Sequence, residues 1–240
     1  MKEKIRALLL SGGYGTRLRP ITKEIPKCLV EINGKTMLEH WLSRLESINC
    51  DACLINTHYL PEKVHNFIKN RNKSEMIIKE VFEKELLGTA GTLIKNSKFF
   101  KDSKILMIHV DNMTNFDLNE LILADTKRPK DCLMTMLTFS TDSPSSSGIV
   151  RKDKNNVLIE FMEKIKDPPS NIANAAIYLF DNNFLNKLIL EKPNAKNFSL
   201  DVIPKFLNQI YTFHTDDKLV DIGTLENLNK ANKVFSSIDN

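Results

Sequence analysis

The feature that most constrains the fold is a short apolar run that leads straight into a glycine-rich turn. The run is Ile5 to Leu10, and the turn after it contains Gly12, Gly13 and Gly15. A continuous apolar run of this length is typical of a strand buried on both faces of a parallel sheet. Glycines directly after such a strand leave backbone N–H groups free to point at an anion. We therefore expect a phosphate-binding loop at the end of the first strand.

The charges beside this loop indicate which kind of phosphate it binds. Arg17, Arg19, Lys23 and Lys27 follow the glycines within a few residues. A Walker A loop is excluded because its GxxxxGK sequence followed by Ser or Thr is absent, and a dinucleotide GxGxxG fingerprint fails because Leu18 occupies the third glycine position. Because so many cations follow the loop, it is better suited to bind a triphosphate and a departing pyrophosphate than the diphosphate of a dinucleotide.

The remaining chain repeats the order strand, loop, helix, which predicts an α/β fold with a mixed, mostly parallel sheet and helices on both faces. Ligands of such sheets bind beyond the carboxyl ends of the strands, and both the glycine loop and Asp111 are expected at that edge. The expected strands are Ile5 to Leu10, Lys27 to Ile32, Cys53 to Asn56, Met76 to Val81, Ile105 to Val110, Cys132 to Phe139, Gly148 to Val150, Val157 to Met162, Asn174 to Phe180 and Gln209 to His214. The expected helices are one capped by Thr36, one from Pro61, Leu118 to Lys127, Asn183 to Leu190 and one from Thr224.

Length and composition set the remaining limits. At 240 residues, a single domain over 1–240 is expected. The net charge of +4 is dispersed, so nucleic-acid binding is not expected. No apolar run is long enough for a membrane span or a signal peptide, so a cytoplasmic protein is expected. The Cys50 to Cys53 CxxC has no partner ligands nearby and is interpreted as reduced cysteines.

The motif GGYGTRLRPITKEIPKCLVEINGKTMLEH resembles the signature of the sugar-1-phosphate nucleotidyltransferases, which make nucleotide sugars from an NTP and a sugar 1-phosphate. Later segments match in order, and together they cover nearly the whole chain: LGTAG at Leu87 to Gly91, Asp111 after a strand, FMEK at Phe161 to Lys164, SNIANAAIY at Ser170 to Tyr178, and VDIGT at Val220 to Thr224. The resemblance implies a Rossmann-like, glycosyltransferase-A-like nucleotidyltransferase fold. It also implies that the single domain has an NTP-binding part at about 1–140 and a sugar-phosphate-binding part at about 141–240. We expect no additional domain after the last helix.

The resemblance also implies roles for residues at the nucleotide end of the site. The backbone of Gly12, Gly13, Gly15 and Thr16 would wrap the triphosphate, Arg17 would bind its β- and γ-phosphates, and Lys27 would lie against the α-phosphate and the incoming phosphate. Asp111 and Asp221 would hold Mg²⁺, a hard cation that prefers carboxylate and phosphate oxygens. Gly88 would belong to the segment that reads the base. These assignments make Arg17, Lys27 and Asp111 the expected catalytic residues.

At the sugar end, the resemblance implies that Glu163 accepts hydrogen bonds from sugar hydroxyls and that Lys164 binds the 1-phosphate. Asn174 would add a sugar contact, and Gly148 would let the backbone approach the substrate closely. Ala176 stands where many members have glycine, which is expected to narrow the sugar pocket. His58 and His109 receive no role.

The function predicted is therefore a Mg²⁺-dependent sugar-1-phosphate nucleotidyltransferase that supplies activated sugars for surface glycans. The variant sequence around Asp111, together with Asn56 to Tyr59, favours GTP and a mannose- or heptose-type sugar. Two alternatives stay open: a cytidylyltransferase acting on phosphocholine or another non-sugar phosphate, and a non-catalytic nucleotide-sensing subunit. A homo-oligomer is compatible with the sequence.

Overall fold

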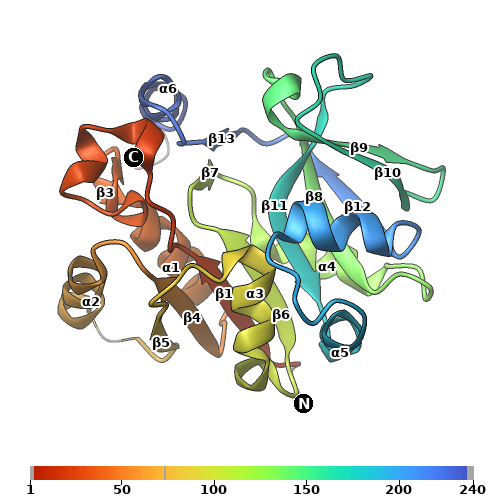
Figure 1. Ribbon diagram of the computed structural model, residues 1–240, viewed down its shortest axis with the longest axis horizontal. Coiled ribbons are helices and arrows are strands. Elements are labelled where there is room, and N and C mark those ends of the chain that lie inside the picture. The colour runs from red at the N-terminus through yellow and green to blue at the C-terminus, as the bar shows by residue number, and fades with distance from the viewer. Residues whose placement is uncertain (1–2, 73, 237–240) are drawn as a thin grey trace. The chain divides into compact units, whose positions relative to one another are not determined.

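The computed structural model describes residues 3–72 and 74–236 (Figure 1). The chain forms two compact units, each assembled from separate stretches of sequence. We name them the loop unit, made of Ile5–Leu86, Ile108–Asn115 and the chain from Lys218 onward, and the β11 unit, made of Leu87–Met107, Phe116–Asp217 and the residues before Ile5. The expectation of a single domain with a division near residue 140 stays a prediction.

Three parallel strands form the sheet of the loop unit. They are β1 (Ile5–Leu10), β4 (Ala52–Thr57) and β5 (Ile77–Phe82), and β4 pairs with both of the others. β4 is buried along its whole length, as expected for a strand covered on both faces. Because the three strands run in the same direction, the residues that follow them collect at one edge of the sheet.

Two helices of the loop unit begin as their sequences predict. At α1 (Met37–Ser47), the Thr36 hydroxyl accepts a hydrogen bond from the backbone N–H of Glu39 at 3.1 Å. Trp41 lies on the apolar face of α1 and is only 2% exposed, and its indole N–H donates to the carbonyl of Val110 at 3.1 Å. This bond fixes α1 to the residue before Asp111. The second helix, α2 (Pro61–Asn70), has proline in its first turn.

The segment after the glycine loop is more irregular than predicted. Three short 3-10 turns, at Thr16–Leu18, Ile21–Lys23 and Lys27–Leu29, occupy most of it. The prediction that Lys27 to Ile32 is extended is therefore wrong in its first half, because i→i+3 backbone bonds from Leu29 to Pro26 and from Val30 to Lys27 close a turn there. The predicted turn at Asn33 and Gly34 is confirmed: both have positive φ and join β2 (Glu31–Ile32) to β3 (Lys35–Thr36).

Two short strands that the sequence pattern did not predict complete the loop unit. β7 (Asn112–Thr114) pairs antiparallel with β13 (Leu219–Asp221), so that Asn112 lies opposite Asp221. The final helix, α6 (Leu225–Val234), begins at the predicted cap, where the Thr224 hydroxyl accepts a hydrogen bond from the backbone N–H of Asn227 at 3.2 Å.

The β11 unit is a mixed sheet with helices. β6 (Lys104–His109) passes from this unit into the loop unit. The other helices and strands of the β11 unit are α3 (Gly88–Lys95), α4 (Leu118–Thr126), β8 (Met134–Ser140), β9 (Gly148–Lys152), β10 (Leu158–Glu163), β11 (Ile172–Phe180), α5 (Asn182–Glu191) and β12 (Ile210–Thr215). β8 runs antiparallel to β11 and parallel to β12, and β9 runs antiparallel to β10 and β11.

Aromatic side chains form much of the core of the β11 unit. Tyr178 and Phe180 from β11 pack against Phe198, with ring centroids 4.8 and 6.5 Å away, and Phe184 from α5 contacts Phe180 and Phe206 at 4.8 and 5.0 Å. Rings at these separations bury large apolar areas and hold their neighbours in fixed orientations. The core therefore anchors β11, from which candidate site residues project.

The predicted fold class is confirmed, because the chain is an α/β protein with a mixed sheet and helices. No helix within the described ranges has the length and apolar character needed to cross a membrane.

Candidate active site

The glycine loop follows β1, and each of its glycines has a different environment. A Cβ on Gly12 would lie 2.9 Å from the Asn56 amide nitrogen, so the backbone there approaches β4 more closely than a side chain would allow. Gly15 has a φ of 63°, a left-handed conformation that favours glycine, and its carbonyl accepts a hydrogen bond from the Thr22 hydroxyl at 2.7 Å. Gly13 is exposed, and a Cβ there would meet no described atom within 4 Å. The loop thus has a fixed base and an open centre.

Lys27 lies between the two carboxylates that were predicted to hold a metal. Its ammonium forms an ion pair with Asp111 and lies 3.4 Å from Oδ1 of Asp221. Burial alone would raise the pKa of Asp111, but the Lys27 ammonium outweighs that effect and holds the pKa below its usual value. Asp111 is therefore ionised at neutral pH.

The short strands β7 and β13 explain how these distant residues meet. Asp111 precedes β7 and Asp221 ends β13, and the backbone N–H of Ile222 donates to the Asp111 carbonyl at 2.9 Å. Pairing of the two strands therefore determines the separation of the carboxylates. Sequence reasoning brought Asp111 and Asp221 together only through the family resemblance, since three-residue strands carry little periodic signal.

Arg17 lies beside Gly223, in the turn that follows Asp221. A Cβ on the buried Gly223 would be 2.8 Å from the Arg17 guanidinium and 3.1 Å from both carboxylate oxygens of Asp221. Because Gly223 has no side chain, the Arg17 guanidinium and the Asp221 carboxylate can both lie close to its backbone. Thr16 and Arg17 are both exposed.

His109 is a neighbour of this cluster for which no role was predicted. Burial lowers the pKa of His109. The charges of Asp111 and Asp221 act to raise this pKa and the charge of Lys27 acts to lower it, but burial is the largest effect, so the ring is neutral at pH 7. Its Nε2 is buried without a hydrogen-bond partner among the described residues. A signal was present, because His109 and Asp111 are two residues apart at the end of a strand and so face the same side.

The chemistry of the donor set fits Mg²⁺. Asp111 and Asp221 present oxygen ligands to one shared cation, the Lys27 ammonium, and hard divalent cations are usually held by one or two carboxylates plus substrate phosphates. Among the residues that the structure describes, no group of three or more His, Cys, Asp and Glu is placed to hold a metal. A metal at this position would therefore need phosphate oxygens to complete its coordination.

Gly148, Glu163 and Lys164, three of the predicted sugar-binding residues, lie together in the β11 unit. Gly148 pairs with Glu163 across β9 and β10, and a Cβ on Gly148 would come within 2.7 Å of the Glu163 carboxylate. Lys164 follows with a φ of 51°, and its ammonium is 3.6 Å from Glu163 Oε1. The Lys164 side chain is exposed and that of Glu163 is half-buried.

Asn174 is held in place by a residue that sequence reasoning left without a role. Its amide Nδ2 donates to the buried Tyr178 hydroxyl at 2.7 Å, and its Oδ1 accepts from the Ala176 backbone N–H at 2.9 Å. Burial raises the pKa of Tyr178, and the Glu163 charge adds to this effect. Tyr178 therefore stays protonated and links Asn174 to the neighbourhood of Glu163. Ala176 has a φ of 53°, at a bulge in β11.

Gly88 begins α3 with a φ of 78°, and a Cβ there would be only 2.4 Å from the Lys196 carbonyl oxygen. That carbonyl accepts a hydrogen bond from the Ala90 backbone N–H at 2.9 Å, so it is not free to move aside. The glycine is thus required by packing between α3 and the segment after α5, whatever else it contacts.

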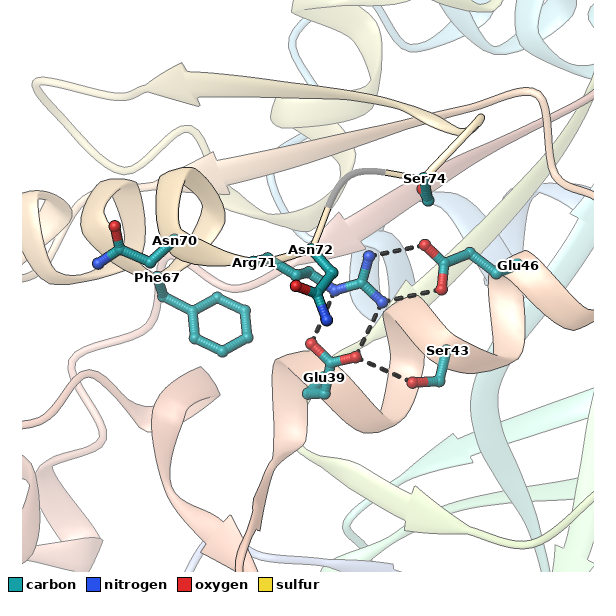
Figure 2. A pocket seen from close by; sticks show the side chains of 8 residues that line it. All are labelled: Glu39, Ser43, Glu46, Phe67, Asn70, Arg71, Asn72 and Ser74. Carbon is teal, nitrogen blue, oxygen red and sulfur yellow. Dashed lines mark hydrogen bonds and ion pairs between the residues drawn. The ribbon is translucent and has the colours of Figure 1, made fainter.

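A separate pocket of about 650 Å³ lies in the loop unit between α1 and the end of α2 (Figure 2). Arg71 forms two hydrogen bonds to the carboxylate of Glu39 and two to that of Glu46, at 2.6 to 2.8 Å. Each of the four carboxylate oxygens therefore accepts a hydrogen bond, and the Arg71 guanidinium joins the end of α2 to α1. The lining side chains are Glu39, Ser43, Glu46, Phe67, Asn70, Arg71, Asn72 and Ser74.

Comparison with known proteins identifies relatives that match most of this chain. The chain is 31% identical over 225 residues to the mannose-1-phosphate guanylyltransferase catalytic subunit beta of Drosophila melanogaster, which covers 91% of this chain and 59% of that protein. It is 30% identical over 226 residues to the mannose-1-phosphate guanyltransferase 2 of Candida glabrata, with 91% and 61% covered. The chain thus spans about three fifths of the length of these relatives.

A similar solved structure is HddC from Yersinia pseudotuberculosis complexed with GMP-PN. It has a TM-score of 0.79 and 25% identity, and the match covers 96% of this chain and 99% of that chain. Residues 6–237 also match the family model described as Nucleotidyl transferase. The resemblance seen in the sequence is confirmed, and the chain belongs to the nucleotidyl transferase family.

Proposed function

We propose that this protein transfers a nucleotidyl group from an NTP, with GTP favoured, to a mannose- or heptose-type sugar 1-phosphate and releases pyrophosphate. The observation that carries the proposal is the Lys27 ammonium shared by Asp111 and Asp221, beside a glycine loop with an open centre at Gly13. GTP and a mannose-type sugar are supported by the names of the two relatives, and GTP also by the GMP-PN in the similar structure.

The reaction needs charge neutralisation more than acid–base chemistry. An ionised oxygen of the sugar 1-phosphate attacks the α-phosphorus, a new P–O bond forms, and the bond from the α-phosphorus to the bridging oxygen breaks as pyrophosphate leaves. The backbone N–H groups of Gly12 to Thr16 and the Arg17 guanidinium would bind the leaving phosphates. Lys27 would offset the charge that develops at the reacting phosphate.

The remaining roles concern the metal and the sugar. Asp111 and Asp221 would hold Mg²⁺, which when bound neutralises phosphate charge and aligns the triphosphate. The acceptor would bind in the β11 unit, through Lys164 to its phosphate and through Glu163 and Asn174 to its hydroxyls. Gly88 would contact the base.

The direct test is a matrix of the four NTPs against phosphocholine and a panel of sugar 1-phosphates, with pyrophosphate release measured and the product identified by mass. GTP with mannose or heptose 1-phosphate is expected to give the fastest release. Release only with CTP and phosphocholine would support the cytidylyltransferase alternative. A melting shift with NTP but no release from any pair would indicate a nucleotide-sensing protein.

Variants test the assignment of the carboxylates. Asp111→Asn and Asp221→Asn are each expected to abolish turnover while circular dichroism stays unchanged, because the amide keeps the shape but loses the charge that a divalent cation needs. Asp216→Asn is the matched control, since Asp216 is fully exposed in the β11 unit. Full activity in either variant would remove that residue from the proposed metal site.

A further inference from the structure

The glycine loop contains little of its own that could hold its shape. Between Gly12 and Gly15, Tyr14 is the only residue with a side chain. Glycine loses more conformational freedom on folding than any other residue, so a loop of this composition samples many conformations unless other groups restrain it. Phosphate binding by backbone N–H groups depends on those groups pointing the same way. A restraint from outside the loop is therefore needed.

The restraint comes from the four residues at the end of β4, Asn56 to Tyr59. At the start of the loop, the Asn56 side-chain carbonyl accepts a hydrogen bond from the Ser11 backbone N–H at 2.8 Å, and the Ser11 hydroxyl donates to the Asn56 backbone carbonyl. The Asn56 amide group in turn donates to the buried Glu83 carboxylate at 3.2 Å. Asn56 therefore fixes the point at which the chain leaves β1.

His58 holds the centre of the loop. Its Nδ1 lies 2.8 Å from the Glu83 backbone carbonyl, and its Nε2 lies 2.7 Å from the Tyr14 hydroxyl. A carbonyl only accepts, so Nδ1 carries the proton, and in the neutral ring Nε2 accepts from the Tyr14 O–H. The two rings also pack edge to face, with centroids 5.1 Å apart. His58 thus fixes the orientation of the Tyr14 side chain, and His58 is itself held by Glu83, the residue that follows β5.

Tyr59 extends the same support to the next turn. Its ring lies 5.8 Å from that of Tyr14, and its hydroxyl donates to the Lys23 carbonyl at 3.1 Å. Three successive contacts, at Ser11, Tyr14 and Lys23, therefore originate from one short segment. All of them lie within the loop unit.

We propose that Asn56, His58 and Tyr59 are positioning residues, and that the bond between His58 and Tyr14 holds the glycine loop in its phosphate-binding conformation. The consequence for catalysis rests on the proposed function, in which this loop binds the triphosphate. The restraint itself is a property of the loop that can be measured without turnover.

The test uses Tyr14→Phe, His58→Asn, the double variant and His58→Gln in the full chain. Asparagine can replace the Nδ1 donor of histidine but is too short to reach Tyr14, whereas glutamine places an amide near the Nε2 position. The matched control is His65→Asn, a histidine on α2 whose partner is Glu80 and whose side chain is 64% exposed. Hydrogen exchange of the amides in residues 11–18 is the readout that is independent of activity.

Tyr14→Phe and His58→Asn are each expected to speed exchange in residues 11–18 and to raise the KM for the NTP by about 2- to 10-fold, the effect of losing one hydrogen bond. The KM for the sugar 1-phosphate should not change, the double variant should be no worse than either single one, and His58→Gln should recover part of the loss. Exchange and NTP KM equal to those of His65→Asn would overturn the proposal. If the wild-type protein turns over no NTP, the proposed function fails and the exchange measurement alone decides whether the restraint exists.

Discussion

Two glycines with nearly the same φ allow the cost of a single steric contact to be measured. Gly88 has a φ of 78° and Gly34 a φ of 79°. Replacing either with alanine imposes left-handed strain of about 1–2 kcal/mol, offset by about 0.4–1 kcal/mol because alanine restricts the unfolded chain. The two positions differ in their surroundings: a Cβ at Gly34 would meet no described atom within 4 Å, whereas one at Gly88 would lie 2.4 Å from the Lys196 carbonyl oxygen.

The clash at Gly88 has no inexpensive relief. The Lys196 carbonyl accepts from the Ala90 N–H, and the Asn197 N–H of the same peptide donates to the Asp201 carboxylate at 2.8 Å, so both polar groups of that peptide are held. Overpacking against fixed atoms costs about 1–3 kcal/mol. We therefore expect Gly34→Ala to lower the free energy of unfolding by about 1 kcal/mol and Gly88→Ala by about 2–4 kcal/mol.

Urea unfolding followed by circular dichroism measures both values, and the slope with denaturant should be the same in the two variants. Because both substitutions add one methyl group at the same φ, the difference between them isolates the contact with Lys196. Equal losses in Gly34→Ala and Gly88→Ala would show that the α3 turn relaxes freely and would refute the reasoning.

Three further predictions concern strain, charge and thiols. Ala176→Gly should raise the free energy of unfolding by up to about 1 kcal/mol in a urea titration, because Ala176 has a φ of 53°. Arg71 lowers the pKa of both of its glutamate partners, so wild-type stability falls as the pH drops from 6 to 3; in Arg71→Met, the thermal midpoint should fall less over that range. Burial raises the pKa of Cys50 to about 11 and raises that of Cys53 well above its usual value, so neither thiol should react with a disulfide reagent at pH 8 until the protein unfolds.

Much of the fold could be predicted because its signals are local. The apolar run of β1, the Thr36 cap and the Asn33 and Gly34 turn each depend on neighbouring residues, and each was found where expected. The 3-10 turn at Lys27–Leu29 was missed, since its bonds give no periodic apolar pattern. An element can thus be predicted where an apolar run, a capping side chain or a turn residue marks it in the sequence, and less well where only backbone hydrogen bonds define it.

The candidate site was predictable only in part for the same reason. The list of residues came from a family resemblance, but the contacts among them depend on β7 and β13, which are too short to show a pattern. The buried Nε2 of His109 and the bond from Tyr14 to His58 depend on atoms brought together by folding. The left-handed conformation of Ala176 was also hidden, because alanine gives no sign of positive φ. The roles assigned to the site residues stay predictions.

The pairing of β7 with β13 also sets when this site can exist during synthesis. Lys27 and Asp111 leave the ribosome long before Asp221, and until β13 emerges the β7 strand has no partner to fix the chain beside Asp111. An N-terminal fragment that stops before residue 219 therefore contains the glycine loop but only one of the two carboxylates. The newly made chain therefore acquires the second carboxylate only once residue 221 has been added, and a product terminated before that point would retain the loop without Asp221.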